Sequence, residues 1–417
     1  MIKPLNSSIN RAALPAALLL AAFLLTALLL AAPVASLRAA DTTPLVTGNT
    51  RFAFDLYSRL KTNDGNLFFS PCSISTCLAM TWAGARGDTE SQMATVLHFD
   101  TNQALLHSQF GDLQTQLNAV QKKKDVALNL ANGLWAQQDH SFLSAFLKTA
   151  TRDYAAKVKQ VDFRADAEPA RKDINDWVSG KTAGRIQDLI PVGTLDATTR
   201  LVLVNAIYFK GQWAAPFKKR DTMPMPFTTA PGQDTEVPFM NLTDNFRYAE
   251  TDGLQLLELP YVGGDLSMVV LLPAETNSFA EFENSLTQEQ LAFWLGQARR
   301  AKVIVFLPKF KLTQQFALGD TLAAMGMTDA FSPSADFSGM DGARDLCISA
   351  VIHKAFVEVN EEGTEAAAAT GVSVGALAVA MPASEYVFRA DHPFVFLIRD
   401  IHTGSILFLG RVTNPGL

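Results

Sequence analysis

Cysteine and charge are both scarce in this chain of 417 residues. The three cysteines, Cys72, Cys77 and Cys347, show no CxxC spacing and cannot all pair with one another. A disulfide scaffold and a zinc knuckle are therefore excluded, and we expect free, buried thiols. Charged residues make up 18%, with 35 basic against 41 acidic residues, a net charge of -6 and no long block of one sign. This composition argues against nucleic acid as a partner.

Motifs for catalysis or cofactor binding are also missing. HExxH and GxSxG do not occur, and the six histidines lie far apart without ligand spacing. Gly180-Lys181-Thr182 resembles the end of a phosphate loop, but the required earlier glycine is replaced by Asn175. The short run at 122–124 (Lys-Lys-Lys) is typical of a solvated helix end or loop, although it could bind a polyanion. We therefore expect no cofactor, no metal, no small-molecule substrate and no catalytic residues.

The first 35 residues have the pattern of an export signal. Lys3 and Arg11 precede an uncharged, Leu- and Ala-rich run over 12–37, and small residues follow at Val34, Ala35 and Ser36. The run exceeds the usual apolar region of about 7–15 residues and approaches the ~20 that span a bilayer. Cleavage after residue 35 is favoured, with retention as a membrane anchor as the alternative. The predicted location is secreted or periplasmic.

The remaining chain, 36–417, is predicted to be one α+β domain. Hydrophobic residues make up 48% of the sequence, enough for a sizeable core, and no repeat, linker or compositional break divides it. Helical spacing over 52–60, an apolar segment over 73–83 and a helix over 278–300, with Ser278 and Glu281 as a capping box, are expected. Runs typical of strands dominate the second half, and the C-terminus is predicted to be a β-hairpin. The strand-like runs cover 126–130, 201–210, 268–272, 303–307, 350–359, 394–398 and 405–412.

One segment does not fit a structural loop. More than thirty residues separate the strand expected over 350–359 from the strand at Phe394, and structureless connections above about 12–15 residues are usually functional. In an extended chain, small or β-branched uncharged residues fall on one side: Thr364, Ala366, Ala368, Thr370, Val372 and Val374. Such a face could enter a packed sheet without displacing side chains. The pattern indicates a strand that is held out of a sheet.

The segment Glu361-Glu362-Gly363-Thr364-Glu365-Ala366-Ala367-Ala368-Ala369-Thr370 resembles the hinge of inhibitory serpins. Further segments are similar to that family in the same order along the chain. They are Asn66-Leu67-Phe68-Phe69-Ser70-Pro71-Cys72-Ser73-Ile74, Gly84-Ala85-Arg86-Gly87-Asp88-Thr89, the stretch from Leu203 to Trp213, Leu307-Pro308-Lys309-Phe310, and the stretch from Asp391 to Phe396. The resemblance covers roughly Thr50 to Pro415.

The resemblance implies a serpin fold, with helices around a large five-stranded central sheet plus smaller sheets and an exposed reactive-centre loop at about 361–390. It also implies suicide inhibition: a serine protease cleaves the loop, the freed strand inserts, and the covalent acyl-enzyme is trapped. The partner is then the target protease, and the inhibitor is expected to be a monomer. Counting fourteen residues past Gly363 places the reactive bond between Leu377 and Ala378.

The resemblance assigns supporting roles to five further residues. Ser70, Ser73, Asn205 and His353 would form a hydrogen-bonded cluster beneath the opening strands, and Trp213 would lie where the loop enters the sheet. Leu377 and its uncharged neighbours imply apolar-specific targets, of the chymotrypsin, elastase or subtilisin type. The alternatives are a non-inhibitory serpin that acts as a carrier or chaperone, and an exported hydrolase, which lacks any nucleophile motif.

Overall fold

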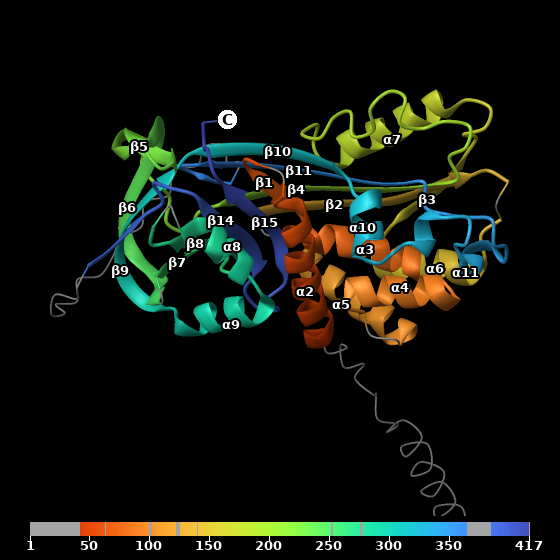
Figure 1. Cartoon of the computed structure of the whole chain (residues 1–417), viewed down its shortest axis with the longest axis horizontal. Helices are drawn as coiled ribbons and strands as arrows, with labels where there is room; N and C mark the ends of the chain where they lie inside the picture. Colours follow the sequence, from red (N-terminus) through yellow and green to blue (C-terminus); the bar gives the residue numbers. More distant parts are fainter. Residues whose placement is uncertain are drawn as a thin grey trace, which may run out of the picture. The chain divides into compact units, whose positions relative to one another are not determined.

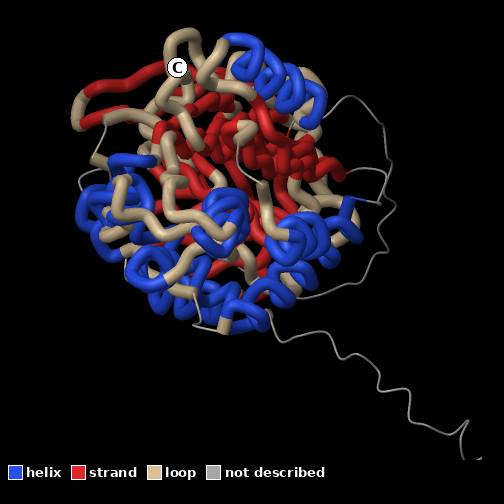
Figure 2. Tube along the Cα trace, turned by 90° about the vertical axis from the view of Figure 1, so that its right-hand side faces the viewer, coloured by secondary structure: helices blue, strands red, loops and turns tan. Residues whose placement is uncertain are grey.

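The computed structural model describes residues 42–62, 64–99, 102–121, 126–139, 141–251, 253–275, 278–364 and 385–416. Residues 41–417 group into one compact unit. Strands run through the middle of this unit, and helices lie above and below them (Figure 2). The predicted export signal at 1–35, the lysine run at 122–124 and loop residues 365–384 lie outside the described residues. Among the described residues, no helix is both long and apolar enough to span a membrane.

The first half of the chain supplies most of the helices. They are α2 (Thr43–Leu60), α3 (Pro71–Trp82), α4 (Gly87–Leu97), α5 (Gln103–Gln121), α6 (Ser144–Tyr154) and α7 (Ala167–Lys181). Helix α3 begins after Ser70, whose hydroxyl accepts a hydrogen bond from the Ser73 amide, and Pro71 occupies the first helical position. All residues of α3 are buried, so this helix forms the middle of the helical layer.

The central sheet has the strand order β10-β11-β12-β4-β2-β3. The bounds are β10 (Phe310–Ala317), β11 (Ala350–Asn360), β12 (Gly363–Thr364), β4 (Leu201–Gln212), β2 (Val126–Gln137) and β3 (Lys157–Val161). Because β12 has only two residues, the sheet consists of five longer strands plus a short insertion. Below that insertion β11 and β4 pair directly and in parallel.

Helices cover both faces of the central sheet. Helix α7 lies on one side, and α2 to α6 gather on the other (Figure 1). The α7 side holds a separate apolar cluster that includes Ile174, Val204 and Ile352, whereas Ile207 and Val357 belong to the larger core on the other side. Alternate residues of β4 and β11 therefore pack into two different cores, as expected for a strand buried on both faces.

A second sheet occupies the other end of the unit, with the order β1-β15-β14-β8-β7-β6-β9-β13 and β5 paired to β6. Its strands are β1 (Leu67–Phe69), β5 (Met223–Ala230), β6 (Gln233–Thr251), β7 (Leu254–Pro260), β8 (Leu266–Pro273), β9 (Arg299–Pro308), β13 (Tyr386–Arg389), β14 (Phe394–Asp400) and β15 (Ile406–Val412). Strands β14 and β15 form the predicted C-terminal hairpin. Short helical segments complete the unit: η1 (Lys219–Asp221), α10 (Gly319–Met325), η3 (Asp329–Phe331) and α11 (Ser338–Asp341).

The predicted single helix over 278–300 was wrong. Two helices occur instead, α8 (Phe279–Ser285) and α9 (Gln288–Gln297), and β9 begins at Arg299. Ser278 has helical backbone angles and its hydroxyl donates to the Glu275 carbonyl, so it does not cap α8. Thr287 is extended and accepts from the Gln290 amide, which makes it the cap of α9. The true start signal therefore lay inside the predicted helix.

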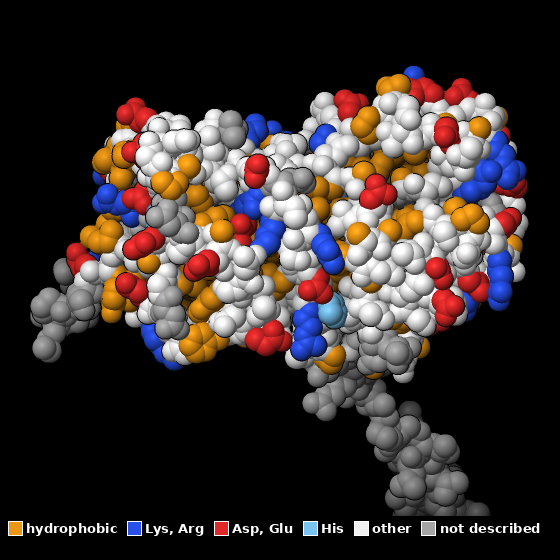
Figure 3. Space-filling model, in the orientation of Figure 1, with side chains coloured by type: hydrophobic (Ala, Val, Ile, Leu, Met, Phe, Trp, Pro, Cys, Tyr) orange, Lys and Arg blue, Asp and Glu red, His pale blue; other side chains and the backbone are white. Residues whose placement is uncertain are grey.

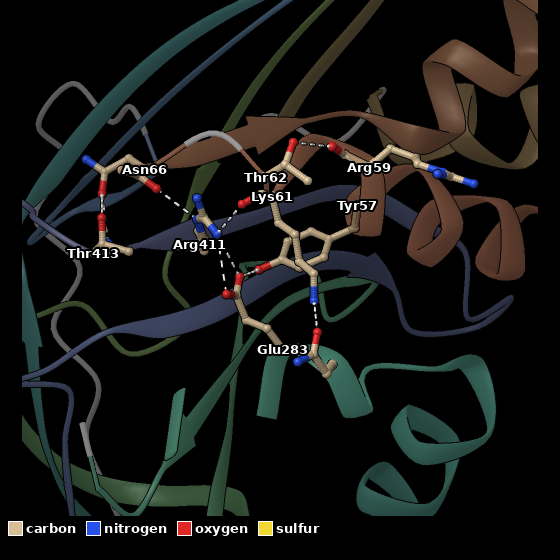
Figure 4. A network of polar contacts seen from close by, with 10 residues as sticks. Tyr57, Arg59, Lys61, Thr62, Asn66, Glu283, Arg411 and Thr413 are labelled. Atoms are coloured by element: carbon tan, nitrogen blue, oxygen red, sulfur yellow. Dashed lines mark hydrogen bonds and ion pairs between the residues drawn. The ribbon is translucent and has the colours of Figure 1, made fainter. Parts of the chain in front are cut away.

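A buried polar network ties α2 and α8 to β15 (Figure 4). Arg411 of β15 and Glu283 of α8 form an ion pair at 3.0 Å with side chains 6% and 10% exposed. The Tyr57 hydroxyl of α2 donates to the same carboxylate. Arg411 also donates to the carbonyls of Lys61 and Gly65. Because removal of either ion would leave the other one buried, this pair is costly to break.

The cysteines and the surface charges agree with most of the composition-based expectations. All three thiols are free; Cys72 and Cys77 are buried, whereas Cys347 is only half-buried. Burial raises the pKa of Cys72 to about 11 and that of Cys77 to about 12, so both stay protonated at neutral pH. On the face in Figure 3, acidic and basic side chains lie among one another.

Candidate functional site

The predicted hinge enters the central sheet at one end. Gly363 and Thr364 of β12 pair with Asn360 and Val359 on one side and with Gln212 and Gly211 on the other. The direct pairing of β11 with β4 covers Ala350–Phe356 and Val202–Tyr208 and ends below this point. The two strands are thus separated by β12 at one end and pair directly with each other only over Ala350–Phe356 and Val202–Tyr208.

Thr364 carries the hinge into the core. Its side chain is fully buried, and its hydroxyl lies 2.7 Å from the Tyr261 hydroxyl. Thr364 is the only described member of the small-residue face predicted over 364–374. It lies on the face of the sheet that packs on the larger core, beside Val359 and Tyr261. The other residues of the predicted face lie outside the described residues, so the alternation itself stays a prediction.

Gly363 has a conformation and a neighbour that exclude a side chain. Its φ is +154°, and a Cβ atom would lie 2.1 Å from the Gly211 carbonyl oxygen. On the facing strand, a Cβ at Gly211 would lie 2.7 Å from the ring of Phe209 and 2.9 Å from that of Tyr261. The two glycines therefore allow the hinge backbone to approach β4 closely.

Trp213 fixes the turn between β11 and β12, which consists of Glu361 and Glu362 at the start of the hinge. Its indole nitrogen donates to the Asn360 carbonyl at 3.0 Å, and its amide donates to the Glu362 carbonyl at 3.0 Å. The indole stacks on Tyr261 with ring centroids 4.7 Å apart and planes inclined by 12°. The Phe217 amide adds a bond to the Glu361 carbonyl. The turn is thus held by two backbone amides and by the Trp213 indole, whose orientation the stack on Tyr261 fixes.

Two ion pairs hold the same turn from its side chains. Glu361 lies 3.0 Å from Lys309 and accepts from the Thr222 hydroxyl, and Glu362 lies 2.7 Å from Lys219. Burial acts to raise the pKa of Glu361, but hydrogen bonds from the backbone and from Lys309 and Thr222 hold that pKa below its ordinary value. The Glu361 carboxylate is therefore ionised at neutral pH.

Ser70, Ser73, Asn205 and His353 lie together beneath the closed part of the sheet. The Ser70 amide donates to His353 Nε2 at 3.0 Å, and His353 Nδ1 lies 2.7 Å from Asn205 Oδ1. Asn205 Nδ2 donates to the carbonyl of Ser73 and to its hydroxyl. The Ser70 hydroxyl donates to the Leu407 carbonyl of β15 at 2.6 Å. The cluster thus joins α3, β4, β11 and β15.

His353 must be neutral in this arrangement. Its Nε2 accepts from an amide, so Nδ1 carries the proton and donates to Asn205. Burial lowers the pKa of His353 to about 3. The hydrogen bond between His353 and Asn205 crosses directly from β11 to β4, because these residues are opposite each other in the parallel ladder.

Sequence reasoning missed three residues that support the site. Asn132 of β2 accepts from Asn205 at 2.8 Å, Tyr261 contacts both Thr364 and Trp213, and Lys309 pairs with Glu361. Only Lys309 stood in a motif that the sequence had singled out. The roles of Asn132 and Tyr261 depend on strand register, which no local pattern reveals.

The predicted reactive bond, Leu377–Ala378, and hinge residues Glu365, Ala366, Ala367, Ala368, Ala369 and Thr370 lie outside the described residues. The chain resumes at Glu385, which pairs with Lys302, and β13 then joins the edge of the second sheet beside β9. No group of three metal-ligating side chains lies close together within the described part of the chain. What the described site presents is a sheet that is opened at one end by the hinge.

Comparison with known proteins gives consistent matches. The family model described as Serpin (serine protease inhibitor) matches residues 47–415. Leukocyte elastase inhibitor of Xenopus laevis is 45% identical over 378 residues, which cover 88% of this chain and 98% of that protein. The human leukocyte elastase inhibitor is 44% identical over 382 residues, covering 89% and 99%.

Solved structures match over the same extent. Uncleaved ovalbumin is 34% identical with a TM-score of 0.79, covering 89% of this chain and 99% of that chain. Maspin is 29% identical with a TM-score of 0.83, covering 90% and 99%. Human thyroxine-binding globulin, solved in complex with thyroxine, is 31% identical with a TM-score of 0.80, covering 90% and 100%. These matches agree in fold and cover nearly all of the described residues.

Proposed function

This chain belongs to the serpin family and is a protease inhibitor, not an enzyme; within that family we propose that it is a suicide inhibitor of apolar-specific serine proteases. The protease attacks the Leu377–Ala378 bond, and insertion of the freed loop into the central sheet traps the covalent acyl-enzyme. The observation that carries the proposal is the position of β12. Gly363 and Thr364 already pair with both β11 and β4, so the first step of strand insertion is present before cleavage.

The register of β12 indicates how insertion would continue. Thr364 pairs with Val359 and Gly211, so each later loop residue would pair one position earlier on both strands. Six residues further along, Thr370 would arrive opposite His353 and Asn205. Insertion must therefore break the direct hydrogen bond between those two side chains, and the Thr370 hydroxyl would be available to replace it. The closed ladder below β12 then acts as the barrier that cleavage must overcome.

The target class follows from the sequence and the relatives together. Leu377, Ala376 and Ala378 cannot pair with the acidic pocket floor of trypsin-like enzymes. The relatives named leukocyte elastase inhibitor support targets of the elastase type. Because apolar pockets discriminate by only about 1–3 kcal/mol per methylene, we infer broad inhibition of elastase-, chymotrypsin- and subtilisin-like enzymes. The inhibitor is further proposed to be exported through residues 1–35 and to act as a monomer.

The proposal is tested by mixing the protein with chymotrypsin, elastase or trypsin and separating the products under denaturing conditions. An inhibitor gives a detergent-stable adduct with the first two enzymes, and the released peptide begins at Ala378. Leu377→Arg should move adduct formation toward trypsin. Because this variant changes only the residue before the proposed reactive bond, it is the control that tests where the loop is cleaved. Cleavage without an adduct would favour the alternative of a carrier; one structural match, thyroxine-binding globulin, was solved with thyroxine bound. Adduct formation with trypsin alone would show that the reactive bond is misplaced.

A further inference from the structure

A cavity of about 400 Å³ lies beside the turn between β11 and β12. Lys219, Phe310, Lys311, Glu358 and Glu362 are among its lining residues. Its volume falls within the range of about 300–1,000 Å³ that is typical of small-molecule sites. None of the steps proposed for protease trapping uses this cavity.

The wall of the cavity carries charges of both signs in equal number. Lys219, Lys309 and Lys311 face Glu358, Glu361 and Glu362. Phe310 and Val359, which are 3% and 1% exposed, supply an apolar floor. A ligand of one net charge would be attracted and repelled by similar numbers of groups. A dipolar ligand with an apolar side chain can satisfy both signs and still contact the floor.

Two opposite charges in the wall have unused capacity. Glu362 accepts from Lys219 through Oε1, but its Oε2 is buried and has no hydrogen-bond partner. A buried acceptor left unsatisfied is unfavourable, so a donor that reached it would be bound. Lys311 Nζ lies 3.8 Å from Glu358, too far for a hydrogen bond, and its other contact is the face of the Phe356 ring. The wall therefore offers one cationic donor at its surface, Lys311, and one acceptor, Glu362 Oε2, that a rotation of the carboxylate would have to bring to it.

We propose that this cavity binds a short zwitterionic peptide of dipeptide size. The ammonium group of the peptide hydrogen-bonds to Glu362, with a small rotation of the carboxylate that brings Oε2 to the cavity. The carboxylate of the peptide pairs with Lys311, and an apolar side chain packs on Phe310. The proposal concerns a ligand site and holds whether or not the protein traps proteases.

The site is tested by isothermal titration calorimetry with the dipeptide Leu-Phe. N-acetyl-Leu-Phe lacks the ammonium group and Leu-Phe-amide lacks the carboxylate, so each should bind about tenfold more weakly, as expected for loss of one charged hydrogen bond. Lys311→Met and Glu362→Gln should each weaken the free dipeptide by a similar factor. Lys172→Met, at an exposed ion pair on α7, is the matched control and should leave binding unchanged.

The capped peptides also assign each contact. Lys311→Met should not weaken Leu-Phe-amide further, and Glu362→Gln should not weaken N-acetyl-Leu-Phe further, because each lost charge has no partner left. Absence of saturable binding at millimolar dipeptide would overturn the proposal, as would equal affinity for the free and capped peptides. The proposal would also be overturned if a variant weakened its capped peptide as strongly as it weakens the free dipeptide. Adduct formation is measured on the same samples. Adducts without binding refute only the ligand site, and binding without adducts refutes only protease trapping.

Discussion

Replacing Thr364 by Arg should convert the protein from an inhibitor into a substrate. Thr364 is fully buried between β11 and β4, so an arginine there would place an unpaired cation in the core. Burying such an ion costs several kcal/mol even after relaxation. The backbone hydrogen bonds of β12 contribute only about 0.5–1.5 kcal/mol each. We therefore expect the variant to fold with its hinge outside the sheet.

The same penalty acts after the loop is cut. Every inserted arrangement in the present register buries residue 364 beside Tyr261, so the transition state for insertion carries part of the cost. Each 1.36 kcal/mol in the barrier changes a rate about tenfold, and a penalty near 3 kcal/mol would slow insertion by about two orders of magnitude. Hydrolysis of the acyl-enzyme then precedes trapping, and the cleaved inhibitor is released.

The assay is the number of inhibitor molecules consumed per protease molecule trapped, measured by titration with elastase and checked on a denaturing gel. Thr364→Val is the matched control, because it keeps the size and neutrality of the side chain and removes only the bond to Tyr261. This control should remain an inhibitor. If Thr364→Arg trapped elastase with the stoichiometry of the unmodified protein, the inference that the buried face must stay uncharged would be refuted.

Three further predictions concern stability. Cleavage after Leu377 should raise the Tm in scanning calorimetry, because the loop gains two strand partners; a cleaved form that melts at or below the intact one would contradict insertion. Acid should destabilise the protein, because the pKa of His353 is about 3 in the folded state and about 6.5 in the unfolded state. As the pH falls from about 6.5 toward 3, the free energy of unfolding should decrease by up to 1.4 kcal/mol per pH unit. His353→Gln should reduce the change in Tm between pH 7 and 5, and an unchanged slope would count against this assignment. Arg411→Met leaves Glu283 buried without its counter-ion and should cost about 3–5 kcal/mol in urea unfolding, with partial recovery in Arg411→Met/Glu283→Leu.

The sequence predicted the elements that depend on local pattern. Alternation located β11, the apolar runs located β4 and β8, and the polar turn between β14 and β15 predicted the hairpin. The hinge stood out because its small residues share a side of an extended chain. The residues that make up each of these patterns lie close together in the sequence, so the patterns can be recognised without knowledge of the fold.

Other features depend on residues that are distant in the sequence. Asn132 joins Asn205 only because β2 and β4 are antiparallel neighbours in a particular register. The pairing of Arg411 with Glu283 requires that α8 pack beside β15. The helix over 278–300 was predicted too long because Thr287, a good cap, was taken as a helical position. Tertiary contacts decided the first two cases, and a local cap that was overlooked decided the third.

Just below β12, the described part of the chain shows no ladder pairing between β11 and β4. No described pairing joins Val357 and Glu358 of β11 to Phe209 and Lys210 of β4. Backbone pairing is nearly blind to side chains, so this opening cannot distinguish the loop of its own molecule from an extended segment of another copy. Tethering favours its own loop, since a short linker holds it at an effective concentration in the millimolar range. Self-association should therefore compete only when the sheet is opened by heat and the protein is concentrated.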